Sequence, residues 1–357
     1  MGIHNGGPGR VVHNRAGPPD RSPEDQPRWA MHGVELLPGL ITVGEARAIG
    51  VDRNRIARGG FVRVRRGTYV PAGTPVDDAD ARMAIAASGL PDAVVLGGWA
   101  AARLHERSVP STSDPLVVFD GAMPGVGAGD QGALPVLVCA PREARIRPLP
   151  GVTLLRSGIE STERVVLEGV PVTSALRTAF DLARTWPLTP GVVALDRLRN
   201  LGLIDAEELE ALTRRKAGWC GVGHVRRALA LSDGGAESPR ETLLRLLWTD
   251  AGLARPLANK VVRDLDGHFV ARVDLVDPDA GVVGEYDGGF HASAGRRSKD
   301  AARQERLEAL GLLMIRACDP DLATPHGRMA WQMRLRDVYA RARAHPPHRR
   351  SWILTDR

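Results

Sequence analysis

Two acidic residues near the C-terminal end of the chain have the spacing of a metal site. Asp274 lies in the run 269–275 and Glu285 in the run 282–286, and both runs read as short β-strands. Hairpin pairing across the intervening turn would bring the two carboxylates to one end of a sheet. Close carboxylates repel each other unless a cation lies between them, and oxygen ligands suit Mg²⁺ or Mn²⁺. The pair therefore predicts a divalent-cation site able to polarise a phosphodiester.

Further polar residues follow this pair at ordered spacings. Asp287 shares the strand face of Glu285, and His291 comes six residues after that glutamate. Asp300 and Arg303 recur at helical spacing in the next predicted helix. Each of them alone is equally consistent with a solvated surface position, whereas the ordered set favours chemistry.

The residues at 271–275 and 284–288, with His291, Asp300-x-x-Arg303 and the run 311–316, resemble the very-short-patch-repair-like endonuclease domain. That family belongs to the PD-(D/E)xK restriction-endonuclease-like superfamily, and the resemblance covers about 110 residues. It implies an α-β-β-β-α-β domain in which Asp274 and Glu285 bind Mg (or Mn). It also implies that Asp287 and His291 lie near the scissile phosphate.

Two positions leave alternatives open. The superfamily signature has lysine where this chain has Asp287, so the resemblance implies that His291 or Lys299 takes over the role of that lysine. Glu241 matches the helical glutamate of the superfamily site. It also forms a capping-box pattern with Ser238 at the start of a predicted helix, and both interpretations stand.

A basic segment near the N-terminus has the layout of a winged helix-turn-helix. Thr42 and Glu45 predict a capped helix that ends at Gly50, and a second helix follows with Asp52 as its cap. Alternating residues on either side of Arg66-Gly67 predict a hairpin.

This head resembles the N-terminal winged helix of abortive-infection type IV antitoxins of the AbiEi type. The resemblance spans about 35 residues and implies operator binding and repression. The implied contacts to double-stranded DNA come from the second helix and the wing, namely Arg53, Asn54, Arg55, Arg58, Arg63, Arg65 and Arg66.

Composition and patterning predict an α+β multidomain protein. A formal net charge of +6 suits a polyanionic partner, and three scattered cysteines exclude a disulfide framework. The chain contains no apolar run of membrane-spanning length, so we expect a cytoplasmic protein without a membrane partner. In the middle we expect strands at 94–96, 116–119 and 134–138, and helices at 174–184, 192–201 and 206–212. The predicted divisions are a disordered leader (1–33), the winged helix-turn-helix (34–86), an α+β linking domain (87–231), the nuclease-like domain (232–345) and a tail (346–357).

Two functions follow as hypotheses. The first is a DNA-binding, metal-dependent endonuclease that cuts or nicks DNA, for example in phage defence. The alternative is an antitoxin-like transcriptional repressor, paired with a toxin, whose nuclease fold is catalytically degenerate. A charge-reversed residue in the lysine position, Asp287, motivates the second hypothesis.

Overall fold

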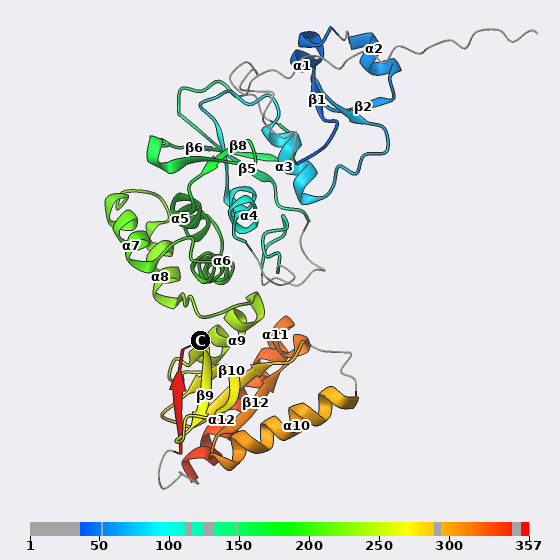
Figure 1. Ribbon diagram of the computed structural model, residues 1–357. Coiled ribbons are helices and arrows are strands. Elements are labelled where there is room, and N and C mark those ends of the chain that lie inside the picture. Colours follow the sequence, from blue (N-terminus) through cyan, green and yellow to red (C-terminus); the bar gives the residue numbers. More distant parts are fainter. Residues whose placement is uncertain are drawn as a thin grey trace, which may run out of the picture.

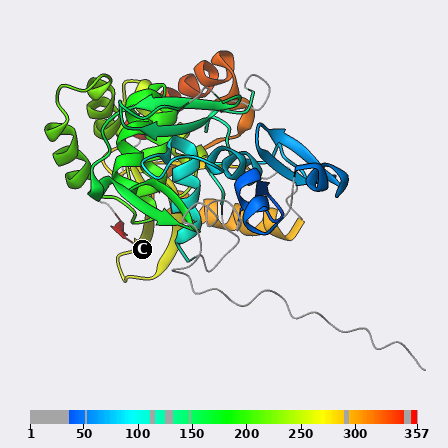
Figure 2. The same ribbon diagram turned by 90° about the horizontal axis from the view of Figure 1, so that it is seen from above.

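The computed structural model describes residues 36–50, 53–110, 116–124, 132–146, 149–288, 294–344 and 351–356. These residues form a mixed α and β multidomain structure with three sheets (Figure 1). An N-terminal head leads to a middle unit, and the middle unit leads to a C-terminal unit. In the view from above, the head projects to one side of the middle sheet (Figure 2).

The head consists of short elements whose ends the sequence specifies. Thr42 caps the first helix and forms the predicted capping box with Glu45, and Gly50 follows the helix with a positive φ of 75°. The predicted hairpin is confirmed, and Gly67 adopts a φ of 81° in its turn. The predicted cap Asp52 lies outside the described residues. The elements are β1 (Ile41–Thr42), α1 (Val43–Ala48), α2 (Arg53–Arg58), β2 (Phe61–Arg65) and β3 (Thr68–Pro71), with strand order β1-β3-β2.

The head has only a small core of its own. Ala46, Ile56 and Tyr69 pack together, whereas Leu37 and Val70 belong to the larger core of the middle unit. The head is therefore packed against the middle unit as well as covalently joined to it.

The middle unit combines a mixed five-stranded sheet with a layer of helices. Its strand order is β6-β5-β4-β8-β7, with β4 parallel to β8 and β5 parallel to β6. The strands are β4 (Val95–Gly97), β5 (Val136–Ala140), β6 (Val152–Arg156), β7 (Arg164–Leu167) and β8 (Val170–Thr173). The helices are α3 (Ala79–Ala87), α4 (Gly98–Ser108), α5 (Ala175–Thr185), α6 (Leu188–Asn200), α7 (Ala206–Arg215) and α8 (Val222–Leu231), and a 3-10 turn spans Ser161–Glu163.

The strand predicted at 116–119 is wrong. Although these residues are apolar, the Glu106 carboxylate accepts hydrogen bonds from the backbone N–H groups of Val118 and Phe119. Arg197 donates to the carbonyl of Leu116. Side chains therefore satisfy this backbone in place of a neighbouring strand.

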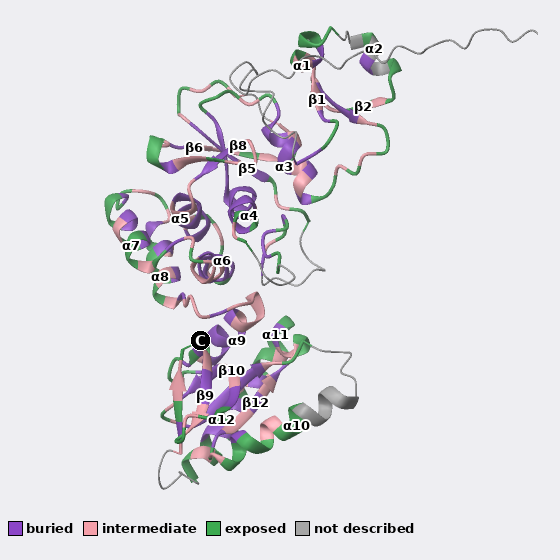
Figure 3. Cartoon of the chain, in the orientation of Figure 1, coloured by how far each residue is buried: buried purple, intermediate pink, exposed green. Residues whose placement is uncertain are grey.

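The C-terminal unit is a five-stranded sheet with helices on both faces, and its first elements follow in the predicted α-β-β-β-α-β order. Core residues of α9 and α12 pack on one face, and Leu307 of α10 packs on the other. The inner strands are largely buried while α10 carries exposed residues (Figure 3). The elements are α9 (Pro239–Asp250), β9 (Leu257–Asp264), β10 (Phe269–Asp277), β11 (Val282–Tyr286), α10 (Ala294–Ala309), β12 (Leu313–Ala317), α11 (Asp319–Ala323), α12 (Pro325–Ala344) and β13 (Trp352–Thr355), in strand order β12-β11-β10-β9-β13.

The segment predicted as a tail contributes the edge strand of this sheet. β13 pairs antiparallel with β9, and the Trp352 side chain is buried in the core. This apolar anchor fixes the strand, which the short, polar-flanked sequence did not suggest.

A buried ion pair joins α9 to the helical layer of the middle unit. Asp196 of α6 accepts hydrogen bonds from Arg245 at 2.6 Å and from Thr242 at 2.8 Å. Both charged side chains are 1% exposed. The same helix thus contacts the middle unit and begins the C-terminal one.

Candidate metal centre

The hairpin β10–β11 brings Asp274 and Glu285 together, as the alternation of the two strands predicts. Its register pairs Leu275 with Gly284, so Asp274 and Glu285 are the next opposed residues. The backbone N–H of Tyr286 donates to Asp274 Oδ2 at 2.8 Å and orients that carboxylate. Two acidic side chains therefore lie side by side at the end of the β10–β11 ladder.

Packing from the other face explains why glycine precedes Glu285. A Cβ atom at Gly284 would lie 2.6 Å from Cζ3 of Trp248 in α9. The missing side chain lets the indole ring press against β11, which fixes the backbone that carries Glu285.

Burial raises the pKa of both carboxyl groups. Glu285 is 8% exposed and Asp274 is partly buried. Desolvation raises the pKa of Asp274, and the charge of Glu285 raises it further. Desolvation likewise raises the pKa of Glu285, and Arg303 offsets part of that effect.

Arg303 of α10 is the direct partner of Glu285. Its Nη1 donates to Glu285 Oε2 at 2.8 Å, and its Nη2 contacts Glu285 Oε1 and the carbonyl of Arg272. The Oε1 contact is an ion pair without ordinary hydrogen-bond geometry, because that buried oxygen accepts no hydrogen bond among the described residues. Glu285 therefore already has one cationic neighbour.

Glu241 lies beside this pair and is tied to its own helix terminus. Its carboxylate accepts hydrogen bonds from the Ser238 hydroxyl at 2.8 Å and the Glu237 backbone N–H at 2.9 Å. Ser238 caps α9 as the sequence predicts. Desolvation raises the pKa of Glu241, and the charge of Asp274 adds to this increase. Both interpretations of Glu241 are thus compatible with its position.

Sequence reasoning missed two polar residues that link these groups. Asn259 of β9 has a φ of 49° and donates to Glu241 Oε2. Arg272 donates to Asn259 Oδ1 at 2.9 Å and forms an ion pair with Glu237. Strand alternation places Arg272 on the same face as Asp274, but it does not predict the contacts of Arg272 with Asn259 and Glu237.

Two other predicted site residues, Asp287 and Asp300, have exposed side chains. Asp287 is exposed after the end of β11, and its backbone N–H donates to the Ala317 carbonyl at 2.8 Å. Asp300 is exposed on α10, and its charge raises the pKa of Glu285. His291 and the side chain of Lys299 lie outside the described residues.

The charge balance of the cluster suits a divalent cation. Five carboxylates and three guanidinium groups take part, which gives a formal net charge of −2 when all of them are ionised. Carboxylate oxygens are the ligands that Mg²⁺ and Mn²⁺ prefer. The residues therefore fit such an ion in donor type and charge. The members are Glu237, Glu241, Asp274, Glu285 and Asp300 with Arg272, Arg303 and Arg316.

A different acidic cluster lies at the turn between β9 and β10. Ligand atoms of Asp264, Asp266 and His268 gather within 4.8 Å of one another, the one such group of three in the described part of the chain. His268 lowers the pKa of Asp264 through hydrogen bonds. The cluster is largely solvent-exposed, and such groups are common without an ion.

The basic residues of the head differ in solvent exposure and in their hydrogen bonds. Arg58, Arg63 and Arg66 are exposed, as is Asn54. The side chains of Arg53 and Arg55 are outside the described part. Arg65 instead donates to the Ser88 carbonyl at the end of α3 and to Thr68 Oγ1 on the neighbouring strand β3. A DNA contact by Arg65 would require these bonds to break.

Comparisons with known proteins identify relatives without assigning an activity. No protein-family model matches the chain. Two proteins of Mycobacterium tuberculosis, from strains CDC 1551 / Oshkosh and ATCC 25618 / H37Rv, are each 27% identical to this chain over 187 residues. The match covers 52% of this chain and 68% of each relative, and both relatives are described as uncharacterized. Among the described residues, no helix is long and apolar enough to span a membrane.

Proposed function

We propose that the C-terminal unit is a PD-(D/E)xK-type nuclease domain, similar to the very-short-patch-repair endonucleases, that hydrolyses or nicks DNA with Mg²⁺ or Mn²⁺. The observation that carries the proposal is the opposed pair of Asp274 and Glu285 inside a partly buried cluster of formal net charge −2. These two carboxylates would hold the ion. When bound, the ion would lower the pKa of a water nucleophile and neutralise the charge that develops on the phosphate.

The surrounding residues would hold this pair in place. The Tyr286 N–H orients Asp274, and Arg303 orients Glu285. Glu241 adds negative charge nearby but keeps both oxygens in hydrogen bonds. We assign it to positioning and electrostatics. The resemblance adds Asp287 and His291 as residues near the phosphate, and His291 lies outside the described residues.

We further propose that the head is an AbiEi-type winged helix that binds double-stranded DNA. Support comes from the exposed Arg58, Arg63 and Arg66 and from the hairpin whose turn carries Arg66. Flexible cations of this kind suit phosphate contacts, which position a protein on DNA. The nuclease domain would thereby be delivered to duplex DNA.

Plasmid cleavage tests the enzymatic proposal. Purified wild-type protein with Mn²⁺ or Mg²⁺ should convert supercoiled plasmid to nicked or linear forms, and EDTA should abolish this. Asp274→Asn should lose at least about 100-fold in rate, because a metal ligand is removed. Asp266→Asn, in the other acidic cluster, should cleave like wild type. Equal cleavage by Asp274→Asn and wild type would refute the site.

A second function is favoured by one observation, the ion pair between Arg303 and Glu285. In a catalytically degenerate site, Glu285 would be paired with an internal cation, here Arg303, instead of a metal ion. Such a site would also not need the signature lysine, whose position Asp287 occupies. The protein would then be an antitoxin-like transcriptional repressor, acting with a partner toxin. It would shift promoter DNA in a salt-dependent way while binding no Mn²⁺ in calorimetry.

A further inference from the structure

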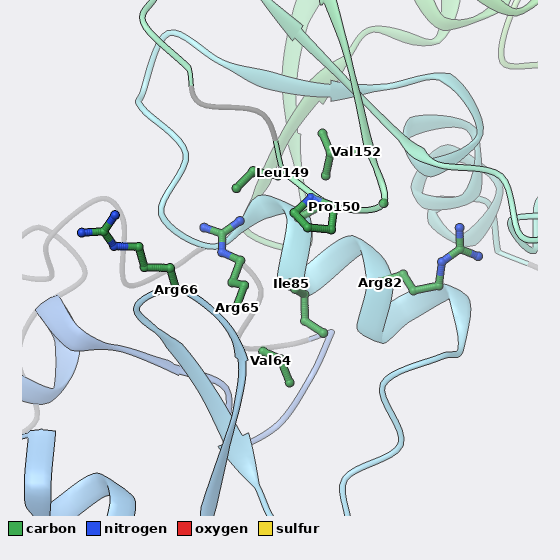
Figure 4. Close-up of a pocket in the computed structure, with 10 residues that line it drawn as sticks. Val64, Arg65, Arg66, Arg82, Ile85, Leu149, Pro150 and Val152 are labelled. Carbon is green, nitrogen blue, oxygen red and sulfur yellow. The ribbon is translucent and has the colours of Figure 1, made fainter.

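A cavity of about 420 Å³ lies where the head meets the middle unit, apart from the carboxylate pair. This volume is in the range typical of small-molecule sites. One wall comes from the head and the other from α3 and the segment before β6 (Figure 4). The cavity is lined by Val64, Arg65, Arg66, Arg82, Ile85, Ala86 and residues 149–152.

The three arginines of the cavity are not equivalent. Arg82 donates to the Leu134 carbonyl and lies 5.0 Å from the ring centre of Trp99. Arg66 is exposed and points outward, whereas Arg65 points toward Leu149 (Figure 4). Arg65 uses Nε and Nη2 in bonds to Thr68 and Ser88, but its buried Nη1 has no acceptor in the described part of the chain. Arg65 thus lines the cavity and carries one guanidinium donor that is buried and without a partner among the described residues.

The rest of the lining is apolar. Val64, Ile85, Leu149 and Val152 face the space around Arg65. A second, separate cavity of about 240 Å³ shares Leu149 and Val152, and its lining includes Val138, Leu154 and Arg156. The first cavity by itself has room for an apolar body of several carbon atoms beside Arg65.

We propose that this cavity binds a small amphipathic anion, a carboxylate with an apolar chain or ring. The carboxylate pairs with the Arg65 guanidinium, and a rotation that brings Nη1 to the cavity surface lets this donor, which has no partner among the described residues, bond to the ligand. The apolar part covers Ile85, Leu149 and Val152. Because the two walls belong to different units, the bound molecule also bridges the head and the middle unit.

Titration of the full-length protein with octanoate, followed by calorimetry, tests the proposal. Octanoate should bind at one site, and 1-octanol, which has the same chain without charge, should bind at least about tenfold more weakly. Arg65→Gln should weaken octanoate binding by at least about tenfold. The control Arg47→Gln, at an exposed position on α1 outside the cavity lining, should stay within about twofold.

Ile85→Trp supplies a second variant that fills the cavity and leaves Arg65 in place. It should bind no octanoate while its thermal unfolding remains cooperative. This variant keeps the test decisive if Arg65→Gln fails to fold, since Arg65 also anchors the head to Ser88. Wild type without a binding heat, equal binding of octanoate and 1-octanol, or wild-type affinity in Ile85→Trp would overturn the proposal.

Discussion

At the scale of single residues, Asp274 and Glu285 are carboxylic acids whose pKa values are raised by folding. Burial and mutual repulsion raise the pKa of Asp274, and burial raises the pKa of Glu285. An acid whose pKa is higher in the folded than in the unfolded protein favours folding when it is protonated. Its contribution to stability is lost as the pH rises from the ordinary carboxyl value through the raised folded value. At neutral pH without metal, these residues therefore oppose folding.

Replacing Asp274 with asparagine should relieve this cost. In EDTA at pH 7 to 8, the Tm of Asp274→Asn should exceed that of wild type, and the difference should shrink as the pH falls toward 5. Thermal melts across this pH range measure the effect. Asp279→Asn, at an exposed position in the turn between the same strands, should follow wild type. A lower Tm for Asp274→Asn throughout would show that the carboxylate stabilises the fold.

Arg303 offsets part of the energetic cost of burying the charge of Glu285. Removing Arg303 should therefore destabilise the metal-free protein. Arg303→Met should lower the free energy of unfolding in EDTA by about 1–3 kcal/mol, less than for a fully buried pair because Arg303 is 28% exposed. Mn²⁺ should raise the Tm of this variant more than that of wild type. Arg306→Met, exposed on the same helix, should change neither quantity. Unchanged stability of Arg303→Met would mean that the ion pair contributes nothing.

At the scale of elements, a buried arginine ties α5 to the sheet of the middle unit. Arg177 is fully buried and binds Asp181 at 2.9 Å, Glu163 at 2.6 Å and the Ser157 hydroxyl at 2.7 Å. Its guanidinium also lies 4.8 Å from the ring centre of Trp219. Several segments of the middle unit thus converge on one side chain.

Arg177→Met should destabilise the middle unit by about 3 kcal/mol, the low end for a broken buried pair, because the two buried carboxylates each lose one of two cations. Asp181 keeps Arg184, and Glu163 keeps Lys216. Urea denaturation followed by tryptophan fluorescence would register the destabilisation as a lower transition midpoint. Arg214→Met breaks an ion pair whose side chains are 66% and 60% exposed, so its midpoint should barely move. Similar midpoints for the two variants would contradict a structural role for Arg177.

Elements with local signals could be predicted from the sequence, and those held by distant contacts could not. The capping box of Thr42 and Glu45 and the turn at Gly67 depend only on residues that are close in the sequence. Helix α3 has apolar residues around most of its surface, so it lacks the periodicity that marks an amphipathic helix. The segment at 116–119 reads as a strand because the sequence does not reveal that Glu106 binds its backbone.

The same distinction applies to the candidate site. Alternation along two strands predicted that Asp274 and Glu285 converge, because strand geometry is local and regular. Contacts of Asn259 and Arg272 depend on how β9 and α9 pack on that hairpin, which no spacing encodes. Helical spacing predicted that Arg303 belongs to the candidate site, but it did not predict the ion pair of Arg303 with Glu285.

At the scale of the whole molecule, the head shares a core with the middle unit, and α9 joins the middle unit to the C-terminal sheet. If the head binds DNA through phosphate contacts, its affinity must fall with salt. The double variant Arg63→Gln/Arg66→Gln should reduce the slope of log K against log salt by about 2, measured by fluorescence anisotropy on a duplex. Arg214→Gln should keep the wild-type slope. Identical slopes for all three proteins would place DNA binding elsewhere.

Direct titration of Mn²⁺ into the metal-free protein tests the central claim, that Asp274 and Glu285 form a divalent-cation site. Calorimetry should give about one ion per chain for wild type and for Asp266→Asn. Asp274→Asn should bind more than about tenfold more weakly, since it loses one of two carboxylate ligands. Absence of binding by wild type, or equal binding by Asp274→Asn with loss in Asp266→Asn, would contradict the claim.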